Sequence, residues 1–140
     1  MVNFENLKLV ALGNPLLDMQ VRDGQDVLQK YGLKPNDAVL ASPEQLSIYE
    51  HLVENYQVTY VAGGAAQNTA RCAQYALPEG STAYLGCVGN DDLAQQLRAA
   101  NEREGLQSVY QVVNDTPTGS CAVVITGHDR SLCTNLGAAE

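Results

Sequence analysis

The segment Gly13-Asn14-Pro15-Leu16-Leu17-Asp18 places an amide and a carboxylate directly after the mostly apolar run of residues 7–12. Ligands of open α/β sheets bind at the carboxyl ends of the strands, so Asn14 and Asp18 lie where a ligand is expected. Asp18 can accept hydrogen bonds from vicinal hydroxyls and Asn14 can both donate and accept, which suits a polyhydroxylated ligand. A surface turn explains the same residues equally well, so the segment alone leaves both interpretations open.

The second candidate segment is Gly63-Gly64-Ala65-Ala66-Gln67-Asn68, between a predicted strand and a predicted helix. Paired glycines let a ligand approach the backbone, and the free N–H groups of a helix start point toward it. Asn68 lies one turn into the helix, within reach of the same pocket. Close packing of helix on strand also requires glycine and remains the alternative. Neither Gly-x-Gly-x-x-Gly nor a Walker A motif occurs, which disfavours nicotinamide-dependent dehydrogenases and P-loop nucleoside triphosphatases.

Other reactive side chains give weaker indications. Arg130 follows a predicted strand within the turn of residues 127–131, where an arginine is either a solvated charge or a phosphate clamp. The four cysteines form no Cys-x-x-Cys pair and read as free, buried thiols, and neither histidine has a partner at metal-ligand spacing. The sequence therefore predicts no metal site.

Charge and length exclude several classes of protein. With 16 acidic against 8 basic residues the net charge is −8, and the scattered basic residues disfavour nucleic acid and anionic membranes as partners. The longest wholly apolar stretch, residues 121–125, is too short to span a membrane. Residues 1–5 show no secretory signal, so we expect a cytoplasmic protein, with the nucleus as the alternative.

The elements that position these residues alternate along the chain in the pattern of an α/β layered fold. Strands are predicted at the following residues: 7–12 (near the sheet centre), 17–22, 37–41, 57–61, 82–88, 108–113, 120–126 and an extended segment at 130–136. Helices are predicted to end at Gly32, to begin at Ser42 (through a capping box to Gln45), to span 65–77, and to begin at a cap on Asn90. Residues 17–22 alternate apolar and polar side chains, which predicts a second, smaller sheet with one wet face.

Together these segments resemble the adenosine kinases of the ribokinase-like (PfkB) family, over essentially all 140 residues. The matching motifs also include the following: Lys34-Pro35-Asn36-Asp37, Gly86-Cys87-Val88-Gly89-Asn90-Asp91, Pro117-Thr118-Gly119-Ser120-Cys121-Ala122 and Ile125-Thr126-Gly127-His128-Asp129-Arg130-Ser131-Leu132. The resemblance implies a three-layer α/β/α sandwich with a small β-sheet lid, inserted at about residues 15–62 and 108–136. The 140 residues would be the N-terminal part of such a kinase domain.

The resemblance also implies a function and roles for individual residues. The enzyme would transfer the γ-phosphoryl of ATP, with Mg²⁺, to the 5′-hydroxyl of adenosine in purine salvage, and would be a monomer when complete. Asp18 would accept hydrogen bonds from the ribose hydroxyls, aided by Asn14, Asn68 and the Gly63-Gly64 backbone. Arg130 would contact the transferred phosphate from the lid. The apolar walls around the purine would come from Leu16, Leu40, Leu132 and Leu136.

The family's Gly-Ala-Gly-Asp motif, which supplies the catalytic base, does not occur in these residues. The resemblance therefore predicts that the 140-residue chain holds the adenosine-binding and lid half, without catalytic base or most of the ATP site, and is inactive alone. Ala38 and Thr134 depart from the pattern of animal members, so the purine edge is expected to be read differently. The alternatives are another sugar or nucleoside kinase of the family, and a non-catalytic nucleoside-binding fragment.

Overall fold

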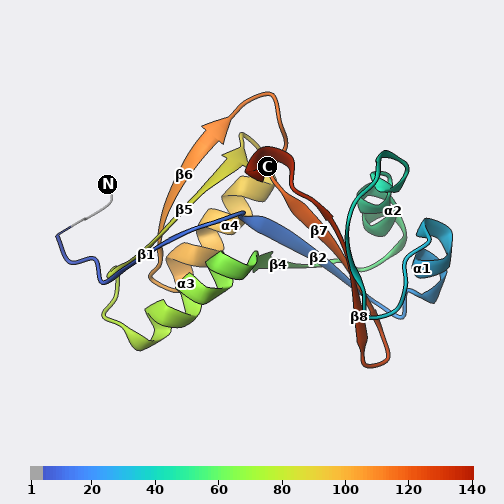
Figure 1. Ribbon diagram of the computed structural model, residues 1–140, viewed down its shortest axis with the longest axis horizontal. Helices are drawn as coiled ribbons and strands as arrows, with labels where there is room; N and C mark the ends of the chain where they lie inside the picture. The colour runs from blue at the N-terminus through green and yellow to red at the C-terminus, as the bar shows by residue number, and fades with distance from the viewer. Residues whose placement is uncertain (1–4) are drawn as a thin grey trace. The chain divides into compact units, whose positions relative to one another are not determined.

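The computed structural model describes residues 5–140; residues 1–4, which enter the prediction that no secretory signal is present, lie outside the described part. In chain order the elements (Figure 1) are β1 (Leu9–Leu12), β2 (Leu16–Arg22), α1 (Gln25–Tyr31), β3 (Ala38–Leu40), the 3-10 helix η1 (Pro43–Gln45), α2 (Ile48–Asn55), β4 (Thr59–Gly63), α3 (Ala65–Ala76), β5 (Thr82–Gly89), α4 (Asp92–Arg103), β6 (Gln107–Val113), β7 (Ser120–Thr126), β8 (Asp129–Asn135) and the 3-10 helix η2 (Gly137–Ala139). No described helix is long and apolar enough to cross a membrane.

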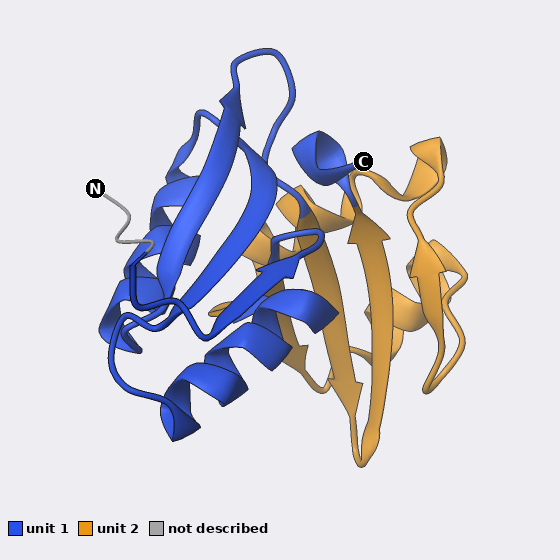
Figure 2. Cartoon of the chain, turned by 60° about the vertical axis from the view of Figure 1, so that its left-hand side comes forward, with its two compact units in different colours: residues 1–17, 62–119, 136–140 blue, residues 18–61, 120–135 orange. Residues whose placement is uncertain are grey.

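The chain divides into two compact units, coloured separately in Figure 2. Unit 1 comprises residues 1–17, 62–119 and 136–140, and unit 2 comprises residues 18–61 and 120–135. Strand β6 pairs with β5 within unit 1, so the segment expected to enter the smaller sheet at residue 108 does so only from residue 120. That unit 2 acts as a lid stays a prediction.

Unit 1 is built on a parallel sheet with the strand order β1-β5-β6. Helices α3 and α4 pack on the face that carries Tyr84 and Val88, both fully buried. Leu97 of α4 is also fully buried, and burying a leucine stabilises a fold by about 1.5–3 kcal/mol. The alternation of side chains along strands sends the residues between these positions to the opposite face.

The opposite face of the unit 1 sheet is apolar and open in the part of the chain that the structure describes. Leu12 pairs in register with Leu85, and Leu85 with Val109, so a row of apolar side chains crosses all three strands. Leu12 is 74% exposed and Val10 is 57% exposed. The prediction that the first strand lies near the sheet centre is therefore wrong for the described residues, since β1 is an edge strand.

Unit 2 is built on a mixed sheet with the strand order β3-β8-β7-β2-β4. Hairpin strands β7 and β8 are antiparallel and turn at Gly127, whose φ of 62° glycine adopts without steric cost. Helices α1 and α2 cover one face, where Val27, Ile48 and Leu52 are fully buried. Helix α1 ends as predicted at Gly32, in the left-handed conformation.

Two local predictions need correction. The helix expected from Ser42 onward is divided into η1 and α2: Gln45 donates its side-chain amide to the Tyr31 carbonyl (2.9 Å) and accepts from the Ser42 N–H (3.0 Å), which fixes the first turn separately. The cap of α4 is Asp91 and not Asn90, because the Asp91 carboxylate accepts the Ala94 N–H at 2.9 Å. The Asn90 side chain instead donates to Asn114.

Candidate functional site

The turn after β1 and the glycine pair before α3 lie against each other in unit 1. A Cβ placed on Gly64 would lie 2.3 Å from the Asn14 carbonyl oxygen, and Gly64 has a φ of 94°. Only glycine combines that conformation with so close a backbone approach. The structure therefore brings together Asn14, Gly63 and Gly64, which the sequence placed 50 residues apart.

Asn68 belongs to the same local structure, because its N–H donates to the Gly64 carbonyl at 2.9 Å in the first turn of α3. Gly64 is the N-cap of α3 and provides no side-chain cap, so the N–H groups at this helix start meet no capping side chain. A groove adjoins the turn at the carboxyl ends of β1 and β5, and its lining includes Gly13, Asn14, Gly86 and Cys87. Such a polar helix start beside a groove suits a ligand with oxygen acceptors.

Gly86 has a structural role beside the turn after β1. A Cβ there would lie 2.7 Å from Pro15 Cδ and 2.9 Å from the Gly13 carbonyl oxygen, so glycine allows the 13–15 turn to cross β5. The groove nonetheless includes Gly86 and Cys87 among its lining residues, which the sequence analysis did not assign to a site.

Leu16 and Leu136 both lie against Gly119 in unit 1. A Cβ on Gly119 would lie 2.6 Å from Leu16 Cδ2 and 2.6 Å from the Leu136 carbonyl oxygen. Both leucines thus adjoin Gly119, although they are 120 residues apart in sequence. Their predicted role beside a purine stays a prediction.

The remaining predicted site residues share one face of the unit 2 sheet. Val21, Val39 and Cys133 belong to the core beneath the helices. Because side chains alternate along each strand, Asp18 on β2, Leu40 on β3, and Arg130 and Leu132 on β8 occupy the opposite face. The structure therefore places these four residues together on the face away from α1 and α2.

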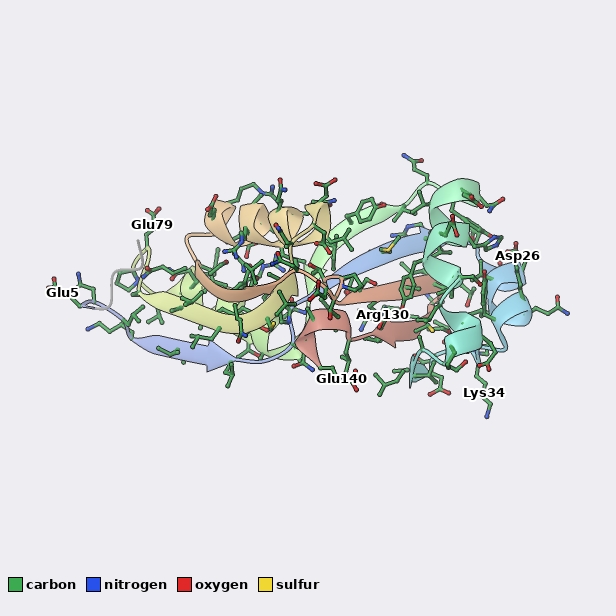
Figure 3. The ribbon with its side chains drawn as sticks, turned by 90° about the horizontal axis from the view of Figure 1, so that it is seen from above. Glu5, Asp26, Lys34, Glu79, Arg130 and Glu140 are labelled. Carbon is green, nitrogen blue, oxygen red and sulfur yellow. The ribbon has the colours of Figure 1, made fainter. Side chains whose placement is uncertain are left out.

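Asp18 and Arg130 influence each other electrostatically. Burial raises the pKa of the Asp18 carboxyl above its usual value, and the positive charge of Arg130 lowers it by a smaller amount. Arg130 is exposed on β8 (labelled in Figure 3), whereas the sequence analysis assigned it to the turn itself. A partly buried carboxylate facing an exposed guanidinium can bind hydroxyl groups at one end and an anion at the other.

Cys121 and Thr134 share this face; Cys121 was absent from the predicted site, whereas the family resemblance had assigned Thr134 to the purine edge. Thr134 Oγ1 donates to Cys121 Sγ at 3.1 Å, and the two residues are paired in register. Burial raises the pKa of the Cys121 thiol to about 11, with the Asp18 charge adding to the shift. Thr134 lies two residues after Leu132 on β8, so strand alternation places it on this face, and its pairing with Cys121 places Cys121 there too.

The described residues contain no group of three or more His, Cys, Asp or Glu side chains that could hold a metal ion. Asp18 has Arg130 as its charged neighbour and no second carboxylate beside it among the charges that shift its pKa. Asp18 thus offers a single carboxylate, and Mg²⁺ in proteins is held by one or two carboxylates together with waters and substrate phosphates.

Comparison with known proteins extends these observations to the whole chain. Over 133 residues the chain is 62% identical to the adenosine kinase of Schizophyllum commune, covering 95% of this chain and 39% of that protein. It is 54% identical to the adenosine kinase of Schizosaccharomyces pombe over 134 residues, covering 94% of this chain and 38% of that protein. The chain thus spans about two fifths of the length of these relatives.

The fold also matches solved structures. Anopheles gambiae adenosine kinase in complex with P1,P4-di(adenosine-5) tetraphosphate superposes with a TM-score of 0.89 at 45% identity, over 94% of this chain and 39% of that one. Schistosoma mansoni adenosine kinase in complex with 2-fluoroadenosine gives a TM-score of 0.86 at 32% identity, over 94% and 39% of the two chains. The predicted α/β fold and the predicted likeness to adenosine kinases are confirmed. Because the model of the pfkB family of carbohydrate kinases matches residues 26–140, this chain belongs to that family.

Proposed function

We propose that the protein containing this chain transfers the γ-phosphoryl group of ATP to the 5′-hydroxyl of adenosine and releases AMP and ADP. The 62% identity to an adenosine kinase supports the choice of nucleoside. The observation that carries the binding role is the close approach of Gly64 to the Asn14 backbone at the start of α3. That arrangement joins the uncapped start of α3 to the turn of Gly13 and Asn14, and these two residues line a groove at the carboxyl ends of β1 and β5.

The proposed roles follow the chemistry of each side chain. Asp18, as the ionised carboxylate, accepts hydrogen bonds from the ribose 2′- and 3′-hydroxyls, while Asn68 and the Gly64 backbone bind the same sugar. Arg130 donates to the oxygens of the transferred phosphoryl group, where negative charge is spread in the transition state. Leu16, Leu40, Leu132 and Leu136 are proposed as the apolar contacts of the purine.

Catalysis of this kind depends on positioning and charge stabilisation more than on covalent chemistry. A carboxylate must take the proton of the 5′-hydroxyl, and Asp18 is unsuited because it is assigned to the sugar hydroxyls. We propose that this base comes from a Gly-Ala-Gly-Asp segment, which does not occur in the 140 residues. Mg²⁺ is proposed only as the companion of the ATP phosphates. We further propose that the protein acts as a monomer in the cytoplasm.

The test is a phosphorylation assay with the complete reading frame that encodes this chain. Adenosine, inosine, ribose and fructose are each supplied with ATP, and the specificity constants kcat/KM are compared. We expect adenosine to be preferred by at least about tenfold, since the lost base contacts of the other substrates are worth more than 1.4 kcal/mol together. A preference for a free sugar would contradict the proposal, and adenosine binding without turnover would identify a non-catalytic binding protein.

A further inference from the structure

A buried polar cluster joins the two helices of unit 1 to its sheet. Gln67 of α3 and Asn101 of α4 are both fully buried, and they meet Ser108 and Tyr110 of β6. The Asn101 amide nitrogen lies 2.8 Å from Ser108 Oγ and 2.9 Å from the Tyr110 hydroxyl. Buried polar groups cost free energy unless they are hydrogen-bonded, so an apolar contact here would be the simpler solution for stability alone.

Gln67 is the member of this cluster that reaches the candidate site. Its Nε2 donates to the Gly63 carbonyl at 3.0 Å, and its Oε1 accepts from the Tyr110 hydroxyl. Asn101 Nδ2 lies 3.4 Å from the same Oε1. Since both ends of the amide are bound, the side chain cannot rotate without breaking at least two hydrogen bonds.

The Gly63 carbonyl belongs to the turn that contacts Asn14. Gly64 has a positive φ and supplies no side-chain cap to α3, so no side chain of its own holds the turn. The Tyr110 ring is itself packed edge-on against Tyr84, with centroids 6.1 Å apart and an interplanar angle of 88°. The chain of contacts therefore runs from a packed aromatic pair, through Gln67, to the backbone of the glycine turn.

We propose that Gln67 is a positioning residue that, held by Tyr110 and Asn101, fixes the Gly63-Gly64 turn in the orientation that recognises the sugar hydroxyls. The inference rests on the proposed function, because it assigns the turn to the ribose of the nucleoside. It predicts a loss of sugar recognition and not merely of stability when the network is cut.

The experiment compares Gln67→Met and Tyr110→Phe with the control Gln74→Met in the complete protein. Gln67→Met keeps the side-chain length but removes both ends of the amide, and Tyr110→Phe removes only the hydroxyl that holds Gln67. Gln74→Met makes the same substitution at another buried glutamine of α3, whose amide donates to the Pro78 carbonyl (2.8 Å) and accepts from the Thr82 N–H (3.0 Å) at the other end of the helix. KM, kcat and thermal unfolding are measured with adenosine, 2′-deoxyadenosine and 3′-deoxyadenosine.

We expect Gln67→Met to raise the KM for adenosine about tenfold and Tyr110→Phe about threefold, with kcat changed less than about threefold, as for the loss of one or two hydrogen bonds. The preference for adenosine over the deoxynucleosides falls in both variants, because a misplaced turn no longer distinguishes the hydroxyls. In Gln74→Met that preference stays within about twofold of wild type, whatever its Tm.

An unchanged preference in Gln67→Met, or in Tyr110→Phe if the first variant does not fold, would overturn the positioning role while leaving the proposed function intact. An equal fall in preference in Gln74→Met would also overturn it, since the effect would then follow general destabilisation. A wild-type protein that does not phosphorylate adenosine would contradict the proposed function instead.

Discussion

Asp18 must be ionised to accept hydrogen bonds from sugar hydroxyls, and its surroundings oppose ionisation. Burial raises its pKa above the ordinary 3.8, and Arg130 offsets part of that shift. The ionised form is therefore lost on acidification at a higher pH than for an exposed aspartate, and nucleoside affinity is lost with it.

Asp18→Ala in the complete protein should abolish useful turnover, because unmatched sugar hydroxyls cost roughly 2–4 kcal/mol. Asp18→Asn should bind adenosine weakly and independently of pH between pH 4 and 7, whereas wild-type affinity should fall as the pH decreases. Calorimetric titrations across this range provide the measurement. Activity of Asp18→Ala within a few-fold of wild type would contradict the ribose assignment.

Arg130→Ala should lower kcat on the order of 100-fold and change adenosine affinity little, since an arginine that meets the phosphoryl group acts chiefly in the transition state. Steady-state kinetics, with adenosine binding measured in the absence of ATP, separates the two effects. Arg22→Ala, which alters an arginine at the end of β2, is the matched control and should leave kcat unchanged. An equal loss of adenosine binding in Arg130→Ala would identify a ground-state role.

Gly64→Ala should lower the stability of the protein by more than the cost of placing alanine at a positive φ. Gly80 also has a positive φ, of 71°, but a Cβ there would meet nothing within 4 Å. Gly80→Ala should therefore cost about 1–2 kcal/mol for its conformation, and Gly64→Ala should lose more, because its Cβ meets the Asn14 carbonyl oxygen. Thermal unfolding and the KM for adenosine are the measurements; equal losses in both variants would contradict a backbone clash.

At the scale of elements, Asp91 ties the end of β5 to the start of α4. Its carboxylate accepts from the Thr118 N–H (2.8 Å) and Thr118 Oγ1 (2.6 Å) as well as from Ala94, and Thr118 Oγ1 accepts from the Gly89 N–H (3.0 Å). Burial raises the pKa of Asp91, but the hydrogen bonds from Thr118 and the helix start outweigh it and hold the pKa below its usual value.

Asp91→Ala should lower the free energy of unfolding by about 1–3 kcal/mol, because it removes a cap and a charged acceptor. The neighbouring Asp92→Ala, at an exposed residue of the first turn, should change it by less than about 0.5 kcal/mol. Since the folded pKa is depressed, the stabilisation by Asp91 is present above pH 4 and is lost as the pH falls through the folded pKa. Urea unfolding at pH 7 and pH 3 tests both statements.

Sequence patterns predicted those elements whose determinants are local. Alternation gave the strand at Leu17–Arg22 and the left-handed glycine gave the end of α1, because both depend on adjacent residues. The cap of α4 was misplaced by one residue, since Asn90 and Asp91 are both good caps and only the position of Thr118, 27 residues away, favours Asp91. Strand β1 was placed at the sheet centre because an apolar run does not reveal how many neighbouring strands pair with it.

The positions of the candidate-site residues could be predicted from the sequence only where local motifs determine them. Asn14, Gly64 and Asn68 follow strand ends or open a helix, so their position follows from local motifs. Cys121 was missed because its position depends on strand pairing across the β7–β8 hairpin, which places it opposite Thr134 and within the electrostatic influence of Asp18 and Arg130.

At the scale of the whole molecule, the open face of the unit 1 sheet determines how residues 1–140 should behave when expressed alone. Parallel sheets are normally covered on both faces, whereas Val10 and Leu12 are more than half exposed here. We expect self-association, visible by sedimentation as species larger than 15.0 kDa, and no ATP-dependent formation of AMP. A monodisperse monomer that phosphorylates adenosine would contradict both expectations.

Replacing Val10 and Leu12 by lysine in the same 140-residue chain is the matched control. If the apolar face drives association, the double variant should sediment closer to a monomer, because charge on an edge strand opposes pairing with a second chain. Association that is unaffected by the two lysines would locate the contact elsewhere.

Unit 2 is assembled from two separate stretches of chain, and this has a consequence for synthesis on the ribosome. Asn36 donates its N–H to Ser131 Oγ across 95 residues, and Asp23 donates to the Ile125 carbonyl. Residues 18–61 therefore emerge long before their partner strands exist. At about 5–20 residues per second, Val21 and Ile48 wait roughly 5–20 s with their apolar side chains uncovered. Binding of a chaperone to the nascent chain should thus be strongest before residue 135 emerges, and codon changes that slow translation between residues 62 and 119 should increase it.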